Sequence, residues 1–384
     1  MPIHRTAFLP SSAAGAYRGT QRASSVPRYA ASRLLGRSGV WLCIAALLSA
    51  CSTTDYYLQL ARGQYQLMSS REPITEVVQD SSRDARLRER LAKVQDARRY
   101  AVGALHLPDN KSYTLYADVH RDYVVWNVFA TPEFSLQPVE SCFPIAGCLA
   151  YRGFYDEKAA EAHAAGLREK GYETDVGGVA AYSTLGWFDD PVINTMMRWS
   201  DAHLIGTLFH ELGHQKLYVK NDTAFNESFA NFVEQQGLSQ YAPGHGLDSA
   251  QEVAYEKRSR EFVELILDGR MRLEKAYAST KDPAQLRTLK QAEFDGLVER
   301  YHQLRDTQWA GYKGYDNFFA EPLNNARLLP FGLYDQWVPA FAALFKQNHD
   351  DWDAFYAAAK TLGELEPQAR LARLKQLAAT ETPS

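Results

Sequence analysis

The sequence lacks the charge pattern of a nucleic-acid-binding protein. Its 384 residues hold 42 Lys and Arg against 46 Asp and Glu, and no basic stripe with interleaved aromatic residues occurs. Nucleic-acid binding is therefore disfavoured. Because residues 1–50 carry six Arg and no acidic residue, the remainder holds 36 basic residues against 46 acidic ones, or −10. This balance also disfavours electrostatic adhesion to an anionic membrane.

The chain also lacks a long apolar run near its N-terminus. The segment Val40–Leu48 has about half the length that a bilayer-spanning helix needs. A basic stretch, a short apolar core and small residues are together typical of a secretory signal. The ending Leu48-Ser49-Ala50-Cys51 resembles a bacterial lipoprotein signal. That resemblance implies a lipid on Cys51 and an outer-membrane lipoprotein facing the periplasm; ordinary signal cleavage and a mitochondrial-type presequence are the alternatives.

Cysteine is scarce, with four residues in the whole chain. Cys43 would leave with the leader and Cys51 would take the lipid, which leaves Cys142 and Cys148. In an oxidising periplasm this pair is expected to form a disulfide that closes a short loop. A zinc site built on the pair is disfavoured, because no second thiol or histidine pair accompanies it.

The most informative stretch is His-Glu-Leu-Gly-His at residues 210–214. At 3.6 residues per turn, His210 and His214 lie one turn apart on the same helix face, where two imidazoles can share one metal ion. Glu211 lies about 100° around the helix, where it can reach a metal-bound water as a general base. The spacing therefore predicts a zinc hydrolase core on one helix, which Ser200 or Asp201 can cap.

Catalytic zinc takes three protein ligands and one water, so a third donor is expected downstream. A metzincin is excluded, because Leu217 and Lys220 stand where that class carries Gly and His. Glu227 is the best candidate, since it lies near the start of a helix expected to stop at Gly237 and can face the histidine pair. His245, in a Pro-Gly-His-Gly loop, is the alternative donor.

The sequence also allows a prediction for Asn231 and for His203. Asn231 follows Glu227 by four residues, so it shares a helix face with that carboxylate and can accept the ring N–H of a ligand histidine. His203 lies on the face of His210 but about 10 Å further along the axis. It is expected at the surface of the first turn or in the surroundings of the site, without bonding to the metal.

These residues carry a family resemblance. His-Glu-Leu-Gly-His followed by Asn-Glu-Ser-Phe-Ala resembles the gluzincin pattern, although only twelve residues separate His214 from Glu227, fewer than in thermolysin-like enzymes. The chain more specifically resembles the bacterial family of putative aminopeptidases, predicted zinc-dependent lipoproteins. Five stretches that span most of the chain after the leader carry this likeness: Trp126–Ala130, Cys142–Cys148, Tyr151–Gly153, Ala181–Gly186 and His210–Ala230.

The pattern of periodicities predicts an α+β protein. After a leader at 1–50, helices are expected over 51–110, a catalytic core over 111–240 and further helices over 241–384. In the core, strands at 113–119 and 123–129 are expected to form a hairpin, followed by a strand at 149–154, a helix at 156–170 and a strand at 176–183. The resemblance implies a zincin-like core, with a small mixed or antiparallel sheet over the metal helix. The stretch 177–183 is the candidate edge strand that pairs with an extended peptide, and its glycines would allow close backbone approach.

The inferred function is zinc-assisted peptide hydrolysis, and the family resemblance points to an aminopeptidase. Glu211 takes a proton from the zinc-activated water and passes it to the leaving amine. Tyrosine usually supplies the oxyanion donor in such sites, and Tyr182, Tyr218 and Tyr334 are the candidates. A peptide or protein is the expected substrate, with the membrane reached through the lipid. Exopeptidase and endopeptidase action both stay open, as does a non-catalytic zinc lipoprotein that serves as a scaffold.

Overall fold

The computed structural model describes residues 6–7, 38–143, 147–184, 188–247, 250–331 and 336–380, except the side chains of residues 6–7, 38–53, 147, 182, 251–252 and 256. The first half contains β1 (Thr6–Ala7), α1 (Ser38–Ser69), β2 (Arg71–Pro73), α2 (Ile74–Gln79), α3 (Ala85–Gly103), β3 (Leu115–Ala117), β4 (Val125–Thr131), β5 (Ser141–Phe143), β6 (Gly147–Leu149), β7 (Tyr151–Phe154), α4 (Glu157–Arg168), β8 (Glu173–Val179), β9 (Ala181–Tyr182) and β10 (Val192–Ile193). The second half contains the 3₁₀ turn η1 (Asn194–Met196), α5 (Asp201–Lys216), α6 (Thr223–Tyr241), α7 (Ala250–Ser279), α8 (Pro283–Thr307), α9 (Asp316–Phe319), α10 (Asn325–Leu328), α11 (Val338–Gln347), α12 (Trp352–Gly363) and α13 (Pro367–Ala379).

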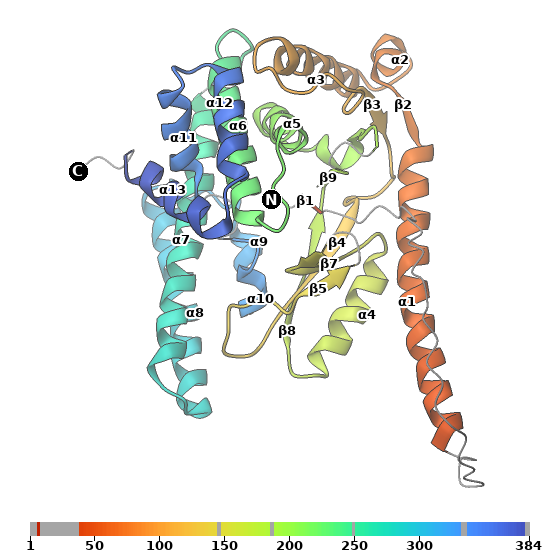
Figure 1. The fold of residues 1–384 in the computed structure, drawn as a ribbon, viewed down its shortest axis with the longest axis vertical. Helices are drawn as coiled ribbons and strands as arrows, with labels where there is room; N and C mark the ends of the chain where they lie inside the picture. The colour runs from red at the N-terminus through yellow and green to blue at the C-terminus, as the bar shows by residue number, and fades with distance from the viewer. Residues whose placement is uncertain are drawn as a thin grey trace, which may run out of the picture.

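The main sheet is small and antiparallel, with the order β7-β4-β8. All seven residues of β4 are buried, because α4 and α10 pack on the sheet and both edges of β4 are occupied. Figure 1 shows this sheet between α1 and α4 on one side and the helices α7 to α10 on the other. The prediction of a mixed α+β protein is confirmed.

The predicted hairpin between β3 and β4 is wrong. β3 pairs with β2 and β10 in a separate three-stranded sheet, whereas β4 pairs with β7 and β8. The connection turns at His120, which has a positive φ of 51°, and Asp118 accepts a hydrogen bond from its backbone N–H. A short link between two strands favours a hairpin only if their edges are free, and here other strands occupy them.

The strand before the metal helix divides in two. β8 pairs with β4 alone among the described strands, so its other side is a sheet edge, and β9 pairs in parallel with β1. A Cβ at Gly178 would lie 2.4 Å from the ring of Tyr123. The absent side chain of Gly178 therefore makes room for that ring, and the close approach of a peptide to this strand stays a prediction.

The helices begin where the capping residues predict. The side chain of Ser200 accepts a hydrogen bond from the backbone of His203 at the start of α5, and Asp222 accepts one from Phe225 at the start of α6. The predicted end of the second helix at Gly237 is wrong, because α6 continues to Tyr241. A Cβ at that glycine would lie 2.8 Å from Leu105 and 3.0 Å from Phe209, so the residue permits close packing instead of a helix end.

Two hydrophobic clusters organise the chain. The larger one joins the N-terminal helices, the sheets, α5 and α6 with α11 to α13. The smaller one lies between α7, α8 and the segment that follows them, and it contains Phe262, Leu297 and Phe331. α7 and α8 pack on each other as a helical hairpin within the region 241–384, which the sequence predicts to be helical. α5, the helix that carries His210 and His214, therefore belongs to the larger core, which holds it in place by packing.

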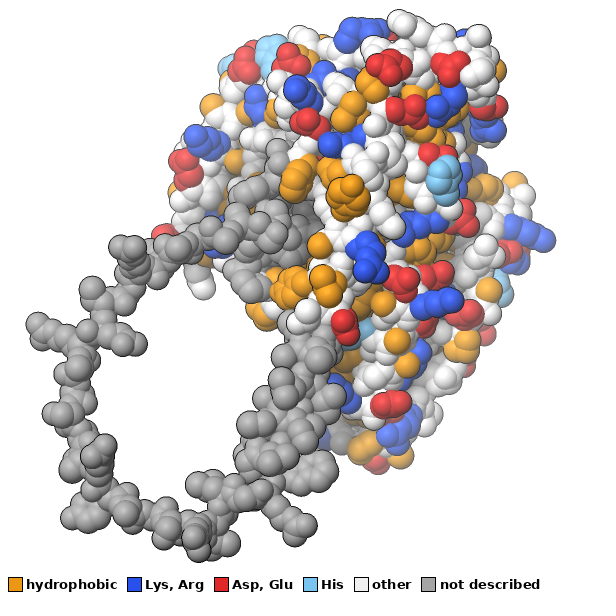
Figure 2. Space-filling view, turned by 90° about the vertical axis from the view of Figure 1, so that its right-hand side faces the viewer, with side chains coloured by type: hydrophobic (Ala, Val, Ile, Leu, Met, Phe, Trp, Pro, Cys, Tyr) orange, Lys and Arg blue, Asp and Glu red, His pale blue; other side chains and the backbone are white. Residues whose placement is uncertain are grey.

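α1 forms one long side of the molecule (Figure 1). The hydroxyl of Tyr56 donates to the carbonyl of Gly153, which fixes this helix on β7. Leu58 and Tyr65 lie on its exposed side, and on this face of the molecule positive and negative side chains are interspersed (Figure 2). No helix among the described residues has the length and apolar character needed to cross a membrane. The side chain of Cys51 lies outside the described part, so its lipidation stays a prediction.

Candidate metal centre

Three ligand-type side chains converge between α5 and α6. The Nε2 atoms of His210 and His214 lie 3.0 Å apart, and Glu227 Oε2 lies 3.5 Å from the first and 3.6 Å from the second. All three side chains are buried, and their donor atoms are close enough together to hold a metal ion. The histidines come from adjacent turns of α5, and the carboxylate comes from the start of α6. This is the grouping that the sequence predicts.

The spacing of the three donors fits a tetrahedral ion. With metal–ligand bonds of about 2.1 Å, donors at tetrahedral corners are roughly 3.4 Å apart, and the observed separations of 3.0, 3.5 and 3.6 Å bracket this value. Two imidazole lone pairs that face each other at 3.0 Å repel unless a proton or a cation lies between them. Among the described residues, no donor has ordinary hydrogen-bond geometry to the buried Glu227 Oε2. A cation between the three side chains satisfies them together.

The charges of this cluster also suit a cation. Burial disfavours the charged form of His210, but the carboxylates of Glu227 and Glu234 outweigh it and raise the pKa of His210 well above its ordinary value. Burial alone would raise the pKa of Glu227, yet the imidazoles of His214 and His210 lower it to about 2. The carboxylate is therefore ionised at neutral pH. An ionised carboxylate beside two imidazoles is a donor set that first-row divalent metals accept.

A second carboxylate orients the first histidine. Glu234 Oε2 lies 3.3 Å from Nδ1 of His210, the ring nitrogen that faces away from the centre. Such a contact fixes the tautomer that leaves Nε2 free to bind a metal. Glu234 follows Glu227 by seven residues, two turns along α6, so helical spacing could have identified it. The sequence analysis proposed Asn231 for this orienting role. Asn231 is half-buried on the same helix, and its role stays a prediction.

A glycine makes room for this orienting carboxylate. A Cβ at Gly206 would lie 2.7 Å from Glu234 Oε1 and 2.8 Å from Leu238 Cδ1. A Cβ at Gly213, seven residues further along α5, would lie 3.5 Å from the backbone of Ala230, an ordinary contact distance. Gly206 is therefore the position at which a missing side chain lets α6 place Glu234 against α5.

Glu211 is buried beside the ligand cluster. Burial raises the pKa of Glu211, while the two neighbouring imidazoles and the nearby hydroxyl of Ser183 act in the opposite direction. A second buried carboxyl, Asp190, lies close enough to interact with Glu211 electrostatically, and burial raises the pKa of Asp190 to about 7. Neither Ser183 nor Asp190 could be identified from the sequence. Neither has a spacing signal, because both lie in the loop that precedes β10.

Of the three tyrosine candidates, only Tyr218 can be placed by its side chain. It stands just after α5, its ring is 46% exposed, and burial together with the nearby Glu227 charge raises its pKa. The side-chain amide of Asn226 holds the adjacent Val219 through two hydrogen bonds of 2.7 Å, one to its backbone N–H and one to its carbonyl. The side chain of Tyr182 and the whole of Tyr334 lie outside the described residues.

The contacts of His245 and His203 test the predictions made for these two histidines. His245 stacks on Tyr241, and its ring nitrogens contact the Tyr241 carbonyl and the Asp96 carboxylate, so these nitrogens are engaged away from the cluster. Glu227, rather than His245, is therefore the residue that completes the candidate ligand group with His210 and His214. His203 is buried against Trp199 at a ring distance of 4.4 Å, which corrects the expectation of a surface position.

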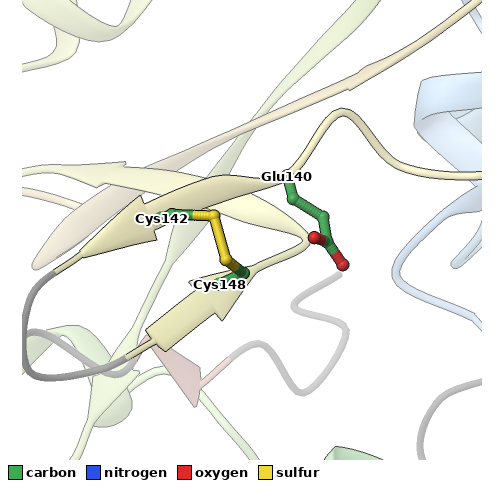
Figure 3. Close-up of side chains that lie close together, drawn as sticks. All are labelled: Glu140, Cys142 and Cys148. Carbon is green, nitrogen blue, oxygen red and sulfur yellow. A yellow bond between two sulfur atoms is a disulfide. The ribbon is translucent and has the colours of Figure 1, made fainter.

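The disulfide expected between Cys142 and Cys148 is present in the β5–β6 hairpin. Glu140 lies beside the two cysteines (Figure 3), and the three side chains are near enough to resemble a metal site. A metal needs cysteine as a thiolate, and both sulfur atoms are already bonded to each other. This exposed group is therefore excluded as a second centre in the oxidised protein.

Comparisons with known proteins agree with the resemblance drawn from the motifs. The family model described as Putative aminopeptidase matches residues 55–374. No curated protein and no solved structure matches the chain. The match includes the converging histidines and carboxylates as well as the helices that surround them.

Proposed function

The chain belongs to the putative aminopeptidase family, and from this premise we propose that it is a zinc-dependent peptidase, of aminopeptidase type, that acts in the bacterial envelope. The observation that carries the proposal is the convergence of His210, His214 and Glu227 beside the buried carboxylate of Glu211. Metal-assisted peptide hydrolysis uses a Lewis acid, a general base and an oxyanion donor. This chain offers residues for each.

His210, His214 and Glu227 would hold the zinc ion. When bound, zinc supplies Lewis acidity, which polarises a carbonyl and lowers the pKa of water toward neutrality. Two neutral nitrogen donors and one carboxylate leave a fourth position of a tetrahedral ion free, as catalytic sites require. The contact of Glu234 with His210 keeps the imidazole in the orientation that this role needs.

Glu211 is the proposed general base. Its carboxylate is buried, and burial makes it a stronger base than an exposed glutamate. It accepts the proton of the attacking water and later delivers that proton to the amine that leaves. Because a purely structural metal site has no need of such a base, Glu211 favours catalysis over a structural role.

Tyr218 is the proposed oxyanion donor. It is partly exposed beside Glu227, so its hydroxyl can reach a substrate carbonyl. The two hydrogen bonds between Asn226 and Val219 set the backbone on which this ring stands. Tyr182 and Tyr334 stay alternative predictions for the same role.

The substrate is proposed to bind as an extended strand next to β8 and β9, in a zincin-like arrangement. The outer edge of β8 pairs with no described strand, although Asn324 donates to the Thr174 carbonyl near its start, and β9 carries a parallel partner of only two residues, Thr6–Ala7. An open edge offers main-chain hydrogen bonds that hold a peptide independently of its sequence. β9 leads directly into Ser183, which contacts Glu211, so a peptide there would lie close to the base.

The envelope location is proposed from two features. The leader resembles a lipoprotein signal, with Cys51 as the acylated residue and attachment to the outer membrane on its periplasmic side. The disulfide between Cys142 and Cys148 suits an oxidising compartment. Mass spectrometry of the protein isolated from membranes would test the acylation, and an unmodified N-terminus at another residue would contradict it.

The function is tested with the zinc-loaded mature protein and a peptide library in which each member has a free or an acetylated N-terminus. We expect release of N-terminal residues from the free peptides, loss of cleavage on acetylation, and no cleavage of either set by Glu211→Gln. Cleavage of acetylated peptides at internal bonds would instead make the protein an endopeptidase.

The second candidate function is a non-catalytic zinc lipoprotein that acts as an envelope scaffold. The helical hairpin of α7 and α8 favours it, because this hairpin has its own hydrophobic cluster apart from the metal centre. A protein that binds one equivalent of zinc and cleaves no member of the library would support the scaffold and overturn the peptidase.

A further inference from the structure

A buried acidic group lies next to the metal centre without a part in the chemistry described above. Asp190 is fully buried in the loop between β9 and β10. Its Oδ2 accepts a hydrogen bond of 2.9 Å from the backbone N–H of Thr184, and its Oδ1 accepts one of 2.8 Å from the Thr184 hydroxyl. The Thr184 hydroxyl oxygen in turn accepts a bond from the backbone N–H of Phe188. The carboxyl group thus closes the loop on itself.

The backbone around Asp190 is anchored by two other parts of the fold. The carbonyl of Asp190 accepts a hydrogen bond of 2.6 Å from the backbone N–H of Tyr113, which precedes β3. The carbonyl of Asp189 accepts one of 2.9 Å from the guanidinium of Arg71 in β2. These two hydrogen bonds fix the backbone position of Asp190. The bonds of its carboxyl group to Thr184 in turn fix the segment that follows β9.

Ser183, the residue that follows β9, lies close to the proposed general base, Glu211. The hydroxyl of Ser183 lies 3.5 Å from Asp190 Oδ2 and also interacts with the Glu211 carboxylate. Ser183 and Asp190 are both fully buried. The hydroxyl donates its one proton toward Asp190. The same hydroxyl faces Glu211, whose two carboxylate oxygens have no partner of ordinary hydrogen-bond geometry among the described residues. The three groups form a continuous chain from the loop to the base.

A loop that needs only hydrogen bonds can be closed by a neutral amide, which avoids the cost of burying an acid. Asp190 is instead an acid, and the hydroxyl of Ser183 that contacts it also faces the second buried carboxylate, Glu211. We propose that Ser183 and Asp190 are positioning residues that hold the Glu211 carboxylate toward the metal centre, Ser183 by direct contact and Asp190 by fixing the strand end that carries Ser183. This inference rests on the proposed role of Glu211.

The test uses zinc-loaded mature protein and the variants Ser183→Ala and Asp190→Asn, with Asp189→Asn as the matched control, since Asp189 contributes its carbonyl rather than its carboxyl. We expect each of the two variants to lower kcat by about 10- to 100-fold, as loss of an aligned base does. KM and zinc content should stay within error of the wild type in both variants, and so should the thermal midpoint of Ser183→Ala. Unchanged kcat overturns the inference, and so does a decrease that follows lost zinc or, in Ser183→Ala, a lowered midpoint.

A double-mutant cycle separates positioning from general support of the fold. Glu211→Asp shortens the side chain by one methylene and withdraws the carboxylate from Ser183. In that background we expect Ser183→Ala to change kcat less than about twofold. A full multiplicative loss would show that Ser183 acts elsewhere and would overturn the inference. If Glu211→Gln retains wild-type kcat, the base assignment itself fails, and that result is distinct from an additive cycle.

Discussion

Replacing Glu234 tests how the metal centre is organised beyond its ligands. The carboxylate lies 3.3 Å from Nδ1 of His210 and makes no bond to the metal in our proposal. Loss of such an orienting partner usually weakens metal affinity by 10- to 100-fold. The contact is longer than the 2.7–2.9 Å of the strongest ionic hydrogen bonds, so the lower end of that range applies. For Glu234→Ala we expect a loss of about tenfold, or roughly 1.4 kcal/mol.

The assay is a competition titration of metal-free protein against a chromogenic zinc chelator. Glu234→Gln keeps an oxygen that can accept from the imidazole, so its loss should be smaller, about two- to threefold. Gln235→Ala, at an exposed position on the same helix turn, is the matched control and should leave Kd unchanged. If Glu234→Ala binds zinc within twofold of the wild type, the orienting role is refuted, and Asn231 becomes the residue to examine.

Three further predictions concern residues around this centre. Glu211→Gln should keep its zinc and lower kcat by several orders of magnitude, and retained turnover would remove this residue from the role of base. Gly206→Ala should displace the Glu234 carboxylate, which would lie 2.7 Å from the new Cβ, and lower zinc affinity several-fold at a nearly unchanged thermal midpoint; unaffected affinity would contradict the geometry. Burial raises the pKa of Asp190 to about 7, so between about pH 4 and pH 7 the folded protein keeps a proton that the unfolded chain releases, and stability from this group falls as pH rises. The stability of the wild type relative to Asp190→Asn should therefore decrease across that window by up to about 4 kcal/mol, measured as urea midpoints at pH 4.5 and pH 7.5; a constant difference would refute the raised pKa.

The local parts of the site could be predicted from the sequence because they depend on helical spacing. His210 and His214 share a face whenever the segment is helical, and the structure places them at 3.0 Å. Glu227 could be nominated because a capped helix follows α5 after a short turn. The prediction at Gly237 was wrong because a glycine in a helical pattern marks either the end of a helix or a place where a neighbouring side chain packs closely. The packing of Phe209 against Gly237 shows that the second applies here.

The tertiary parts could not be predicted. Asp190 and Ser183 precede the metal helix in a loop without periodicity, and they meet Glu211 only because Tyr113 and Arg71 anchor that loop from distant parts of the chain. The pairing of the strands could not be predicted from the sequence either. The strands β3 and β4 are neighbours in sequence, yet each finds its partners elsewhere. Register and sheet membership depend on which edges are covered, and a single sequence does not show this.

The central claim is that His210, His214 and Glu227 jointly hold one zinc ion. Elemental analysis of the mature protein, purified and dialysed against metal-free buffer beside His214→Ala and Glu227→Ala, tests it most directly. The account predicts one equivalent of zinc per chain in the wild type and a large decrease in both variants. A wild-type protein without metal, or variants that retain the full equivalent, would contradict it.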